Sequence, residues 1–405
     1  MELASIADSS GGIRASGTPG YDLSIDFVAR TLDDIGFAVE TPEAAFTTFR
    51  EMPGTMLEIG DERFAGDNEL RALIYSPSGD AGGPIAVLEE SGCETDHFVG
   101  VPQGAIVVIV ERGCLRLDQA LNAQAAGAAA MLVTSGEQGP GEVLRPTLID
   151  PDAIEIPVLS VTAEAAEVLR VSAGDEAHVV VQTEGEVTML RSVVAQFGDG
   201  DRIVMLGAHL DSVLDGPGIN DNGSDVAALL EVARGVAERG VPPGTAVRIG
   251  LWGGEEFGSV GSRAYAAGLQ EDELVAYLNL DMAGSRNGAN LVYAEAQAAA
   301  GSDRVTRAFE AWFAERELPS DTIDLSGSSD HFGFAMAGIP TGGLFAGASE
   351  PLTDAQAEMF GGTAGIEADR CYHLECDDLD NVDLARVATF ADATISVALR
   401  LAEAP

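Results

Sequence analysis

The sequence predicts an α/β layered domain that carries a separate β-rich module. From residue 186 to the C-terminus at 405, apolar runs of strand length alternate with helical periods, which is typical of layered α/β folds. Between residues 53 and 185, short β-rich runs follow one another with few helical periods among them. Residues 1–52 lack a core of their own, so we assign them to the α/β domain and interpret the module as an insertion.

The N-terminal piece and the module consist of short elements. A loop at 11–22 leads into a helix over Ser24–Ile35, where apolar residues recur at helical spacing, and a short strand near Phe37–Val39 follows. The module's strand-like runs lie at 83–90, 104–113, 129–136, 156–161 and 178–184. An Ala-rich helix is expected at 117–128 and another at 163–171.

The C-terminal part repeats a strand–helix pattern. Its apolar, strand-like runs lie at 193–197, 202–210, 246–254 and 274–282. The helical periods between and after them lie at 225–238, 261–268, 304–316 and 384–402. The last of these predicts a closing amphipathic helix.

The composition limits the classes of partner. The chain has 405 residues, enough for two domains, and an apolar content of 46% that supplies a packed core. Its 66 acidic and 22 basic residues give a net charge of −44, and every basic residue is Arg. Such a surface repels nucleic acid and anionic lipid, and it is typical of a solvated acidic coat like that of salt-adapted proteins. No apolar run approaches the length of about 18 residues that a membrane helix needs.

The four cysteines form two close pairs in the sequence, Cys93 with Cys114 and Cys371 with Cys376. An even count with local spacing favours two disulfides and an oxidising compartment, so we expect an extracellular or periplasmic location. The first residues, MELASIADSSGG, do not have the pattern of a signal peptide. Free buried thiols are the alternative. A metal site at Cys371, His373 and Cys376 is a third option, disfavoured because the other pair has no matching ligands nearby.

The most informative stretch runs from Gly207 to Glu256, where polar groups follow apolar runs. His209 ends such a run, and Asp211 faces the same side of a strand, so its carboxylate is expected to hold the imidazole ring. Asp221 lies in a Gly/Asn-rich turn before a helix. We assign Asp221 to a metal site and Asp225 to the helix cap.

Further carboxylates follow the next two apolar runs. Glu255 and Glu256 are adjacent, so one can bind a metal while the other reaches a water on it. Asp281 ends the run YLNLD, where a buried carboxylate is costly unless it is paired or metal-bound. Each of these acids also has a simpler interpretation as a surface group or a turn former, because the chain is so acidic.

Three histidines lie in the α/β part of the chain. His373, beside Tyr372 in the Cys371–Cys376 segment, is the stronger candidate ligand, and Tyr372 can donate a hydrogen bond to an oxyanion. His331 is a weaker candidate, which we leave open as a core residue, a ligand or a neighbour of the site. His97 and His178 lie in the module, and we expect both at the surface.

Six sequence blocks occur in order: GAHLDSV, GINDNGSD, WGGEEFGSVGSRAY, LNLDMAG, SDH followed by GGLFAGA, and GGTAGIEADRCYHLECD. Together they cover most of residues 187–385 and resemble the co-catalytic di-zinc aminopeptidases of the secreted bacterial leucyl aminopeptidase and aminopeptidase Y types. The segment GGIRASGTPGYD resembles the first loop of that family. The β-rich module resembles a protease-associated domain inserted into the peptidase, including a disulfide of the Cys93–Cys114 kind.

The resemblance implies a mixed central sheet flanked by helices, as in zinc exopeptidases, and two zinc ions per chain. It makes Asp221 the bridging carboxylate. His209 and Asp281 complete one zinc site, and Glu256 and His373 complete the other.

The resemblance also implies the catalytic groups and the substrate. Glu255 becomes the general base, Tyr372 the oxyanion donor, and Phe345 a wall of the pocket for the first, apolar side chain of a peptide. Some secreted members have Arg where this chain has Ser328, which leaves its contact with the substrate backbone open. The chain resembles the family from within its first helix, so an export signal is expected to precede it. We expect a monomer.

Two alternatives differ from this interpretation. A carboxypeptidase for acidic C-terminal residues needs clustered arginines, whereas only Arg263, Arg286 and Arg370 lie near these motifs. The glutaminyl cyclisation chemistry of another relative is disfavoured further. A non-catalytic, peptidase-like binding ectodomain is expected to lack ligands or the base, and this chain keeps them all.

Overall fold

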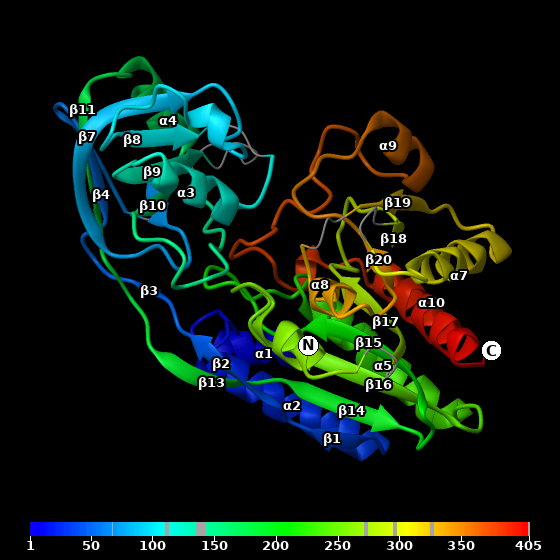
Figure 1. The fold of residues 1–405 in the computed structure, drawn as a ribbon. Helices are drawn as coiled ribbons and strands as arrows, with labels where there is room; N and C mark the ends of the chain where they lie inside the picture. Colours follow the sequence, from blue (N-terminus) through cyan, green and yellow to red (C-terminus); the bar gives the residue numbers. More distant parts are fainter. Residues whose placement is uncertain are drawn as a thin grey trace. The chain divides into compact units, whose positions relative to one another are not determined.

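The computed structural model describes residues 1–66, 68–109, 113–134, 143–270, 274–294, 298–324 and 328–403. The chain divides into two compact units (Figure 1). The first unit combines Met1–Phe46 with Met189–Pro405, and the second is Thr47–Thr188. The second unit is therefore inserted between two parts of the first.

The first unit is built on an eight-stranded mixed sheet. Its strands, in spatial order, are β1 (Ala38–Glu40), β14 (Val193–Phe197), β16 (Thr245–Trp252), β15 (Arg202–His209), β17 (Leu274–Asp281), β20 (Thr341–Phe345), β18 (Leu291–Tyr293) and β19 (Asp321–Ile323). The central strands β16, β15, β17 and β20 are parallel, while β1 and β14 pair antiparallel with their neighbours. Strand β18 is antiparallel to β20 and parallel to β19. The predicted fold class is confirmed.

Helices cover this sheet in two groups (Figure 1). One group contacts the sheet and is joined by contacts of α2 with α5 and of α10 with α5 and α7. Its helices are α2 (Pro19–Ile35), α5 (Gly223–Arg239), α7 (Ser302–Glu315) and α10 (Leu384–Glu403). The other group is α6 (Val260–Ala267) and α8 (His331–Met336), which contact each other, β16 and β17.

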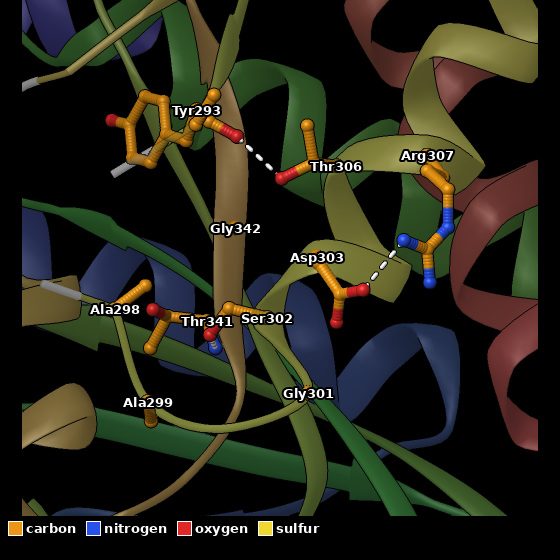
Figure 2. Close-up of a pocket in the computed structure, with 11 residues that line it drawn as sticks. Tyr293, Ala298, Ala299, Gly301, Ser302, Asp303, Thr306, Arg307, Thr341 and Gly342 are labelled. Carbon is orange, nitrogen blue, oxygen red and sulfur yellow. Dashed lines mark hydrogen bonds and ion pairs between the residues drawn. The ribbon is translucent and has the colours of Figure 1, made fainter. Parts of the chain in front are cut away.

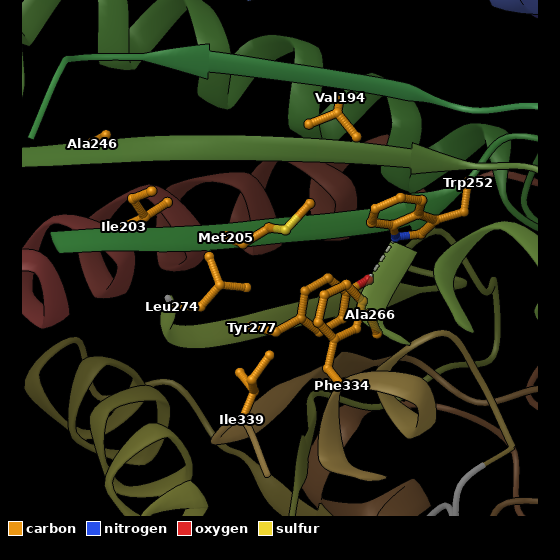
Figure 3. Packing of buried hydrophobic residues seen from close by; sticks show 10 residues of the cluster. All are labelled: Val194, Ile203, Met205, Ala246, Trp252, Ala266, Leu274, Tyr277, Phe334 and Ile339. Atoms are coloured by element: carbon orange, nitrogen blue, oxygen red, sulfur yellow. Dashed lines mark hydrogen bonds between the residues drawn. The ribbon is translucent and has the colours of Figure 1, made fainter. Parts of the chain in front are cut away.

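A buried cluster fixes the central strands against α6 and α8 (Figure 3). Tyr277 of β17 stacks on Phe334 of α8 with ring centroids 3.8 Å apart. The indole of Trp252, at the end of β16, donates to the Tyr277 hydroxyl at 2.9 Å. Because Trp252 precedes Glu255 and Glu256 by a few residues, this packing anchors the start of the glutamate loop.

The second unit contains its own eight-stranded sheet. Its strands, in spatial order, are β5 (Glu62–Ala65), β4 (Met56–Ile59), β11 (Glu176–Val181), β7 (Gly79–Leu88), β8 (Ile106–Ile109), β9 (Ala130–Thr134), β10 (Val158–Val161) and β6 (Leu70–Ala72). Helix α3 (Arg116–Ala125) contacts β9, and α4 (Ala163–Val171) contacts β7. The far ends of two predicted runs, at 110–112 and 135–136, lie outside the described residues.

Short strands lie where the chain passes between the units: β2 (Glu43–Thr47) pairs with β13 (Val187–Arg191), and β3 (Arg50–Glu51) pairs with β12 (Thr183–Glu184). The sequence interpretation missed several short elements. Glu2–Ser9 forms helix α1, whose Leu3, Ile6 and Ala7 are buried. It also missed α9 (Asp354–Phe360) and the strands β18, β19 and β20.

Candidate metal centre

The predicted ligands come from the carboxyl ends of three adjacent parallel strands. His209 is the last residue of β15, Glu255 and Glu256 follow β16, and Asp281 is the last residue of β17. Parallel neighbours end at one edge of the sheet, which is why residues up to 72 positions apart in the sequence meet. Asp221 joins them from the turn before α5.

The first group of potential ligands consists of His209, Asp221 and Asp281. Nε2 of His209 lies 3.0 Å from Oδ1 of Asp221 and 3.5 Å from Oδ1 of Asp281. One ligand atom of each residue lies within 4.8 Å of the others. Imidazole nitrogen and carboxylate oxygen at such spacing suit a zinc ion.

The second group consists of Asp221, Glu256 and His373. Nε2 of His373 lies 3.2 Å from Oδ2 of Asp221 and 3.2 Å from Oε2 of Glu256. Asp221 therefore turns one carboxylate oxygen toward each group. Glu255 lies beside both, since it has a potential ligand atom within 4.8 Å of those of His209 and Glu256.

Two buried carboxylate oxygens in these groups have no donor to pair with in the described part of the chain, which favours a bound cation. Oε1 of Glu256 and Oδ1 of Asp281 have no hydrogen-bond partner among the described residues. A buried carboxylate without a donor is destabilising unless a cation or a proton compensates it. Together with two imidazoles facing carboxylates, these oxygens form a donor set that fits zinc.

A main-chain carbonyl sets the orientation of His209. Nδ1 of His209 lies 3.1 Å from the carbonyl oxygen of Asp211 and 3.7 Å from its carboxylate. The nearer partner is thus the carbonyl, whereas the sequence interpretation expected the carboxylate. A proton on Nδ1 directed at this carbonyl leaves Nε2 free to bind a metal. The Asp211 carboxylate instead accepts hydrogen bonds from the Ser16 hydroxyl and the Glu255 amide.

Charges in the site shift the ionisation of both histidines. Burial acts to lower the pKa of His209, but the nearby carboxylates of Asp211, Asp221 and Asp281 outweigh it and raise that pKa well above 6.5. Burial also acts to lower the pKa of His373, but the charges of Glu256 and Asp221 outweigh it and raise that pKa well above 6.5. Burial acts to raise the pKa of Asp221, but its contacts with His209 and His373 outweigh burial and lower that pKa.

Desolvation acts in the opposite direction on Glu255. Although its side chain keeps some contact with solvent, desolvation raises the pKa of Glu255 well above its usual range, and the acids Asp330 and Glu256 add to this. A carboxylate with a raised pKa accepts a proton more readily than an ordinary glutamate does.

The loop that carries Tyr372 and His373 is closed by the disulfide Cys371–Cys376, and the second predicted disulfide, Cys93–Cys114, is also present. The two aromatic rings stack with centroids 3.8 Å apart. His373 adopts a φ of 62°, a conformation that few side chains adopt without support from their surroundings. Tyr372 also packs against a buried cluster that contains Phe345.

Asp225 does not cap α5, so that part of the sequence interpretation is wrong. The N-cap is Asn222, and Asp225 lies in the first turn. Its carboxylate accepts a hydrogen bond of 2.9 Å from the amide of Ala283, two residues after Asp281. Asp225 therefore ties the helix to the loop that carries a predicted ligand.

His331 and Ser328 lie apart from the two groups of potential ligands. His331 is buried with its ring edge-on to Tyr293, at 5.0 Å between centroids, and Ser328 is exposed. Ser329, which follows Ser328, is linked to the site more closely, since its hydroxyl donates to Oδ2 of Asp281 at 2.8 Å.

Sequence reasoning missed a second carboxylate that shapes the Asp221 turn. Asp377 accepts hydrogen bonds from the main-chain amides of Asn220 at 2.8 Å and Asp221 at 3.0 Å. It follows Cys376 directly, so it joins the disulfide loop to the turn. The run ECDD offered a signal, but nothing in it distinguishes this acid from its exposed neighbour Asp378.

In the module, His97 and His178 are half-buried and have local partners. Nδ1 of His97 accepts from the amide of Glu94, and Nε2 of His178 lies 2.7 Å from Asp80. Neither belongs to a group of potential metal ligands among the described residues.

Comparison with known proteins identifies the family of this chain. Residues 192–398 match peptidase family M28, and residues 81–169 match the PA domain. The chain is 37% identical, over 94% of its length and 79% of the relative's, to a probable lipoprotein aminopeptidase of Mycobacterium tuberculosis. The chain belongs to peptidase family M28. The predicted resemblance to a zinc peptidase with an inserted protease-associated domain is thereby confirmed.

Further proteins match over nearly the whole chain. An aminopeptidase of Pseudomonas aeruginosa is 34% identical over 97% of this chain and 78% of its own. The aminopeptidase from Aneurinibacillus sp. strain AM-1 superposes with a TM-score of 0.77 at 26% identity, over 98% of this chain and 92% of that one. A zinc aminopeptidase from Bacillus subtilis shares the fold, with a TM-score of 0.71 at 23% identity over 98% and 92%.

A pocket of about 380 Å³ lies at the N-terminal end of α7 (Figure 2). The Thr306 hydroxyl donates to the carbonyl of Tyr293 at 2.7 Å, and Asp303 pairs with Arg307 at 2.5 Å. None of the family M28 ligand candidates lines it. The pocket is therefore distinct from the metal centre.

Proposed function

We propose that this family M28 protein is a zinc-dependent aminopeptidase that removes an apolar N-terminal residue from peptides, using two zinc ions and Glu255 as general base. The observation that carries the proposal is the carboxylate of Asp221, which turns one oxygen toward His209 and the other toward His373. The relatives named aminopeptidase, and the neighbour named a zinc aminopeptidase, support it.

Five residues would hold the two ions. His209 and Asp281 would bind one, Glu256 and His373 the other, and Asp221 would bridge them. Zinc ions in such a site supply Lewis acidity toward a carbonyl and lower the pKa of water. The carbonyl of Asp211 fixes the ring of His209, and Ser329 holds one oxygen of Asp281.

Glu255 would move the proton. Its carboxylate accepts a proton from the attacking water and passes it to the nitrogen of the leaving amine, which breaks the peptide bond. The main-chain amide of Glu255 donates to Asp211 at 3.3 Å, which fixes the residue's position beside the ligands.

Tyr372 would stabilise the developing oxyanion by donating its hydroxyl proton. Desolvation raises the pKa of Tyr372 well above 10, so the hydroxyl keeps its proton at neutral pH. Phe345 lies in the same buried cluster as Tyr372 and is 6% exposed. We propose it as an apolar wall for the first side chain of the substrate.

We also propose that residues 1–52 and 186–405 form the peptidase domain around an inserted protease-associated domain at 53–185. The two disulfides and the lipoprotein relative support an extracellular or cell-envelope location. Among the described residues, no helix has the length and apolarity to cross a membrane.

Hydrolysis of leucine p-nitroanilide and of its N-acetylated form tests the proposal. We expect rapid release from the free amine, little from the blocked substrate, and loss of turnover with a zinc chelator. Equal cleavage of the free and the N-acetylated substrate would refute the proposal that the protein is an aminopeptidase. Release of a C-terminal glutamate from an N-blocked peptide, without release of N-terminal residues, would favour the carboxypeptidase alternative.

A further inference from the structure

Arg14 is a buried cation held by carbonyl groups of one loop. It lies between α1 and α2, and its side chain has no exposed surface. Nε donates to the carbonyl of Pro217 at 3.0 Å, Nη1 to that of Leu210, and Nη2 to that of Gly218. All three acceptors belong to residues 210–218, the segment between His209 and Asp221 in the sequence.

The main chain of Arg14 binds the same loop. Its amide donates to the hydroxyl of Ser212 at 2.9 Å, and the amide of Ser212 donates to the carbonyl of Arg14 at 3.3 Å. The loop is thus held at its start by Ser212 and Leu210 and at its end by Pro217 and Gly218.

The neighbouring Ser16 extends these contacts to the loop that carries Glu255 and Glu256. Its hydroxyl donates to Oδ2 of Asp211 at 3.1 Å and accepts from the amide of Gly254 at 2.8 Å. Residues 14–16, which we call the N-terminal strap, therefore join the loop after β15 to the loop after β16.

The charge of Arg14 suits this place. Burial lowers the pKa of Arg14 to about 10, and the charges of Asp211, Asp377, Asp221 and Glu256 oppose the shift. The side chain therefore stays cationic at neutral pH. A planar guanidinium can satisfy three separated carbonyls at once, whereas an ammonium group donates from a single point. Both the geometry of its donors and its positive charge therefore favour Arg at this position.

Two glycines let the loop pass close to its neighbours. Gly218 has a φ of 61°, and a Cβ at that position would lie 2.3 Å from the carbonyl oxygen of Asp221. At Gly216, a Cβ would lie 2.3 Å from the carbonyl oxygen of Leu374, next to His373. The loop therefore passes close to ligand candidates of both groups, and its carbonyls converge on Arg14.

We propose that Arg14 is a positioning residue for the metal centre, whose guanidinium holds the 210–218 loop so that His209 and Asp221 keep the spacing that metal binding requires. This inference rests on the proposed function, because it assumes that these two residues are ligands. It assigns a role to the N-terminal strap, which contains none of the ligand candidates.

The test compares Arg14→Lys with the wild type and with Arg234→Lys, a control at an exposed arginine that pairs with Glu231 on α5. Zinc affinity of the metal-free protein is measured by competition with a chromophoric chelator, beside kcat, KM and thermal unfolding. We expect about 10- to 100-fold weaker zinc binding for Arg14→Lys, the size typical for groups that orient ligands. We expect kcat to fall and KM to change little, with Arg234→Lys like the wild type.

Ser212→Ala gives a milder variant that leaves the buried charge in place and keeps the inference testable if Arg14→Lys does not fold. It should weaken zinc binding in the same direction but by less. Unchanged zinc affinity and kcat in these variants, with only a lower unfolding temperature, would overturn the inference. Absence of zinc binding by the wild type would instead overturn the proposed function, so the two failures are distinguishable.

Discussion

Nε2 of His209 lies 3.0 Å from Oδ1 of Asp221, although a loop of eleven residues separates them in the sequence. Both side chains are nearly inaccessible to solvent, so their contact occurs where a charge is poorly screened. The second oxygen of the same carboxylate faces His373. Under the proposed function, this arrangement lets two metal positions share the carboxylate of Asp221.

Removing His373 should affect one metal position more than the other. We expect His373→Ala to retain about one zinc per chain and to lose at least about 100-fold in kcat/KM. The metal position without its imidazole ligand binds zinc less tightly, and an absent ion supplies no Lewis acidity. Zinc content after gel filtration and steady-state kinetics measure the two effects. His178→Ala, a partly exposed histidine of the other unit, is the control. Two tightly bound zincs in His373→Ala would contradict its role as a ligand.

Zinc binding should release protons at neutral pH. In the metal-free protein, nearby carboxylates raise the pKa of His209 and that of His373 well above 6.5, which favours the protonated form of both rings. A metal binds only the neutral imidazole, so affinity should rise with pH through the neutral range and fall on acidification. Calorimetric titration in two buffers of different ionisation enthalpy should show release of at least about one proton per chain. Heats that do not depend on the buffer would count against these pKa directions.

The disulfide Cys371–Cys376 should support activity directly. It closes the loop in which His373 adopts its unusual φ, so its loss lets the loop populate other conformations. We expect the double Cys→Ser variant to bind zinc less tightly and to lose at least about tenfold in kcat/KM. The matched control is the double variant of Cys93 and Cys114, which lies in the other unit and should keep both values. Equal losses in the two variants would indicate a general effect on folding.

Salt should stabilise the folded protein. The chain carries 66 acidic residues against 22 arginines, and their repulsion is screened as the Debye length falls from about 10 Å at 0.1 M salt to about 3 Å at 1 M. We expect the midpoint of thermal unfolding to rise with KCl over that range at a fixed, saturating zinc concentration. Circular dichroism measures it. A midpoint that stays constant or falls would show that the acidic surface is not under net repulsion.

The sequence predicted the long elements well because their periodicity is strong. The strands that became β15, β16 and β17 read as apolar runs, and α5, α7 and α10 as helical periods. The short helix α1 was missed because eight residues with only a few apolar positions resemble a loop. The edge strands β18 and β19 span three residues each, too few to show a pattern.

The site was harder to derive from the residues alone. Family resemblance gave the assignments of ligands and base, and the structure brings those side chains together. The contacts of Arg14 with Leu210 and Gly218 span about 200 positions, and no local pattern reveals such pairs. Asp225 was assigned to the helix cap because Asp is a preferred N-cap residue near the start of a helical period, but its partner, the amide of Ala283, lies on another segment.

The proposed function assigns the proton transfer to Glu255, in a site where two metal positions share Asp221. Glu255→Ala tests it most directly, with zinc content and turnover of leucine p-nitroanilide measured on the same sample. We expect about two zinc ions per chain, as in the wild type, and a loss of about 10²- to 10⁴-fold in kcat. Turnover retained within a few-fold of the wild type, with both zincs bound, would contradict it.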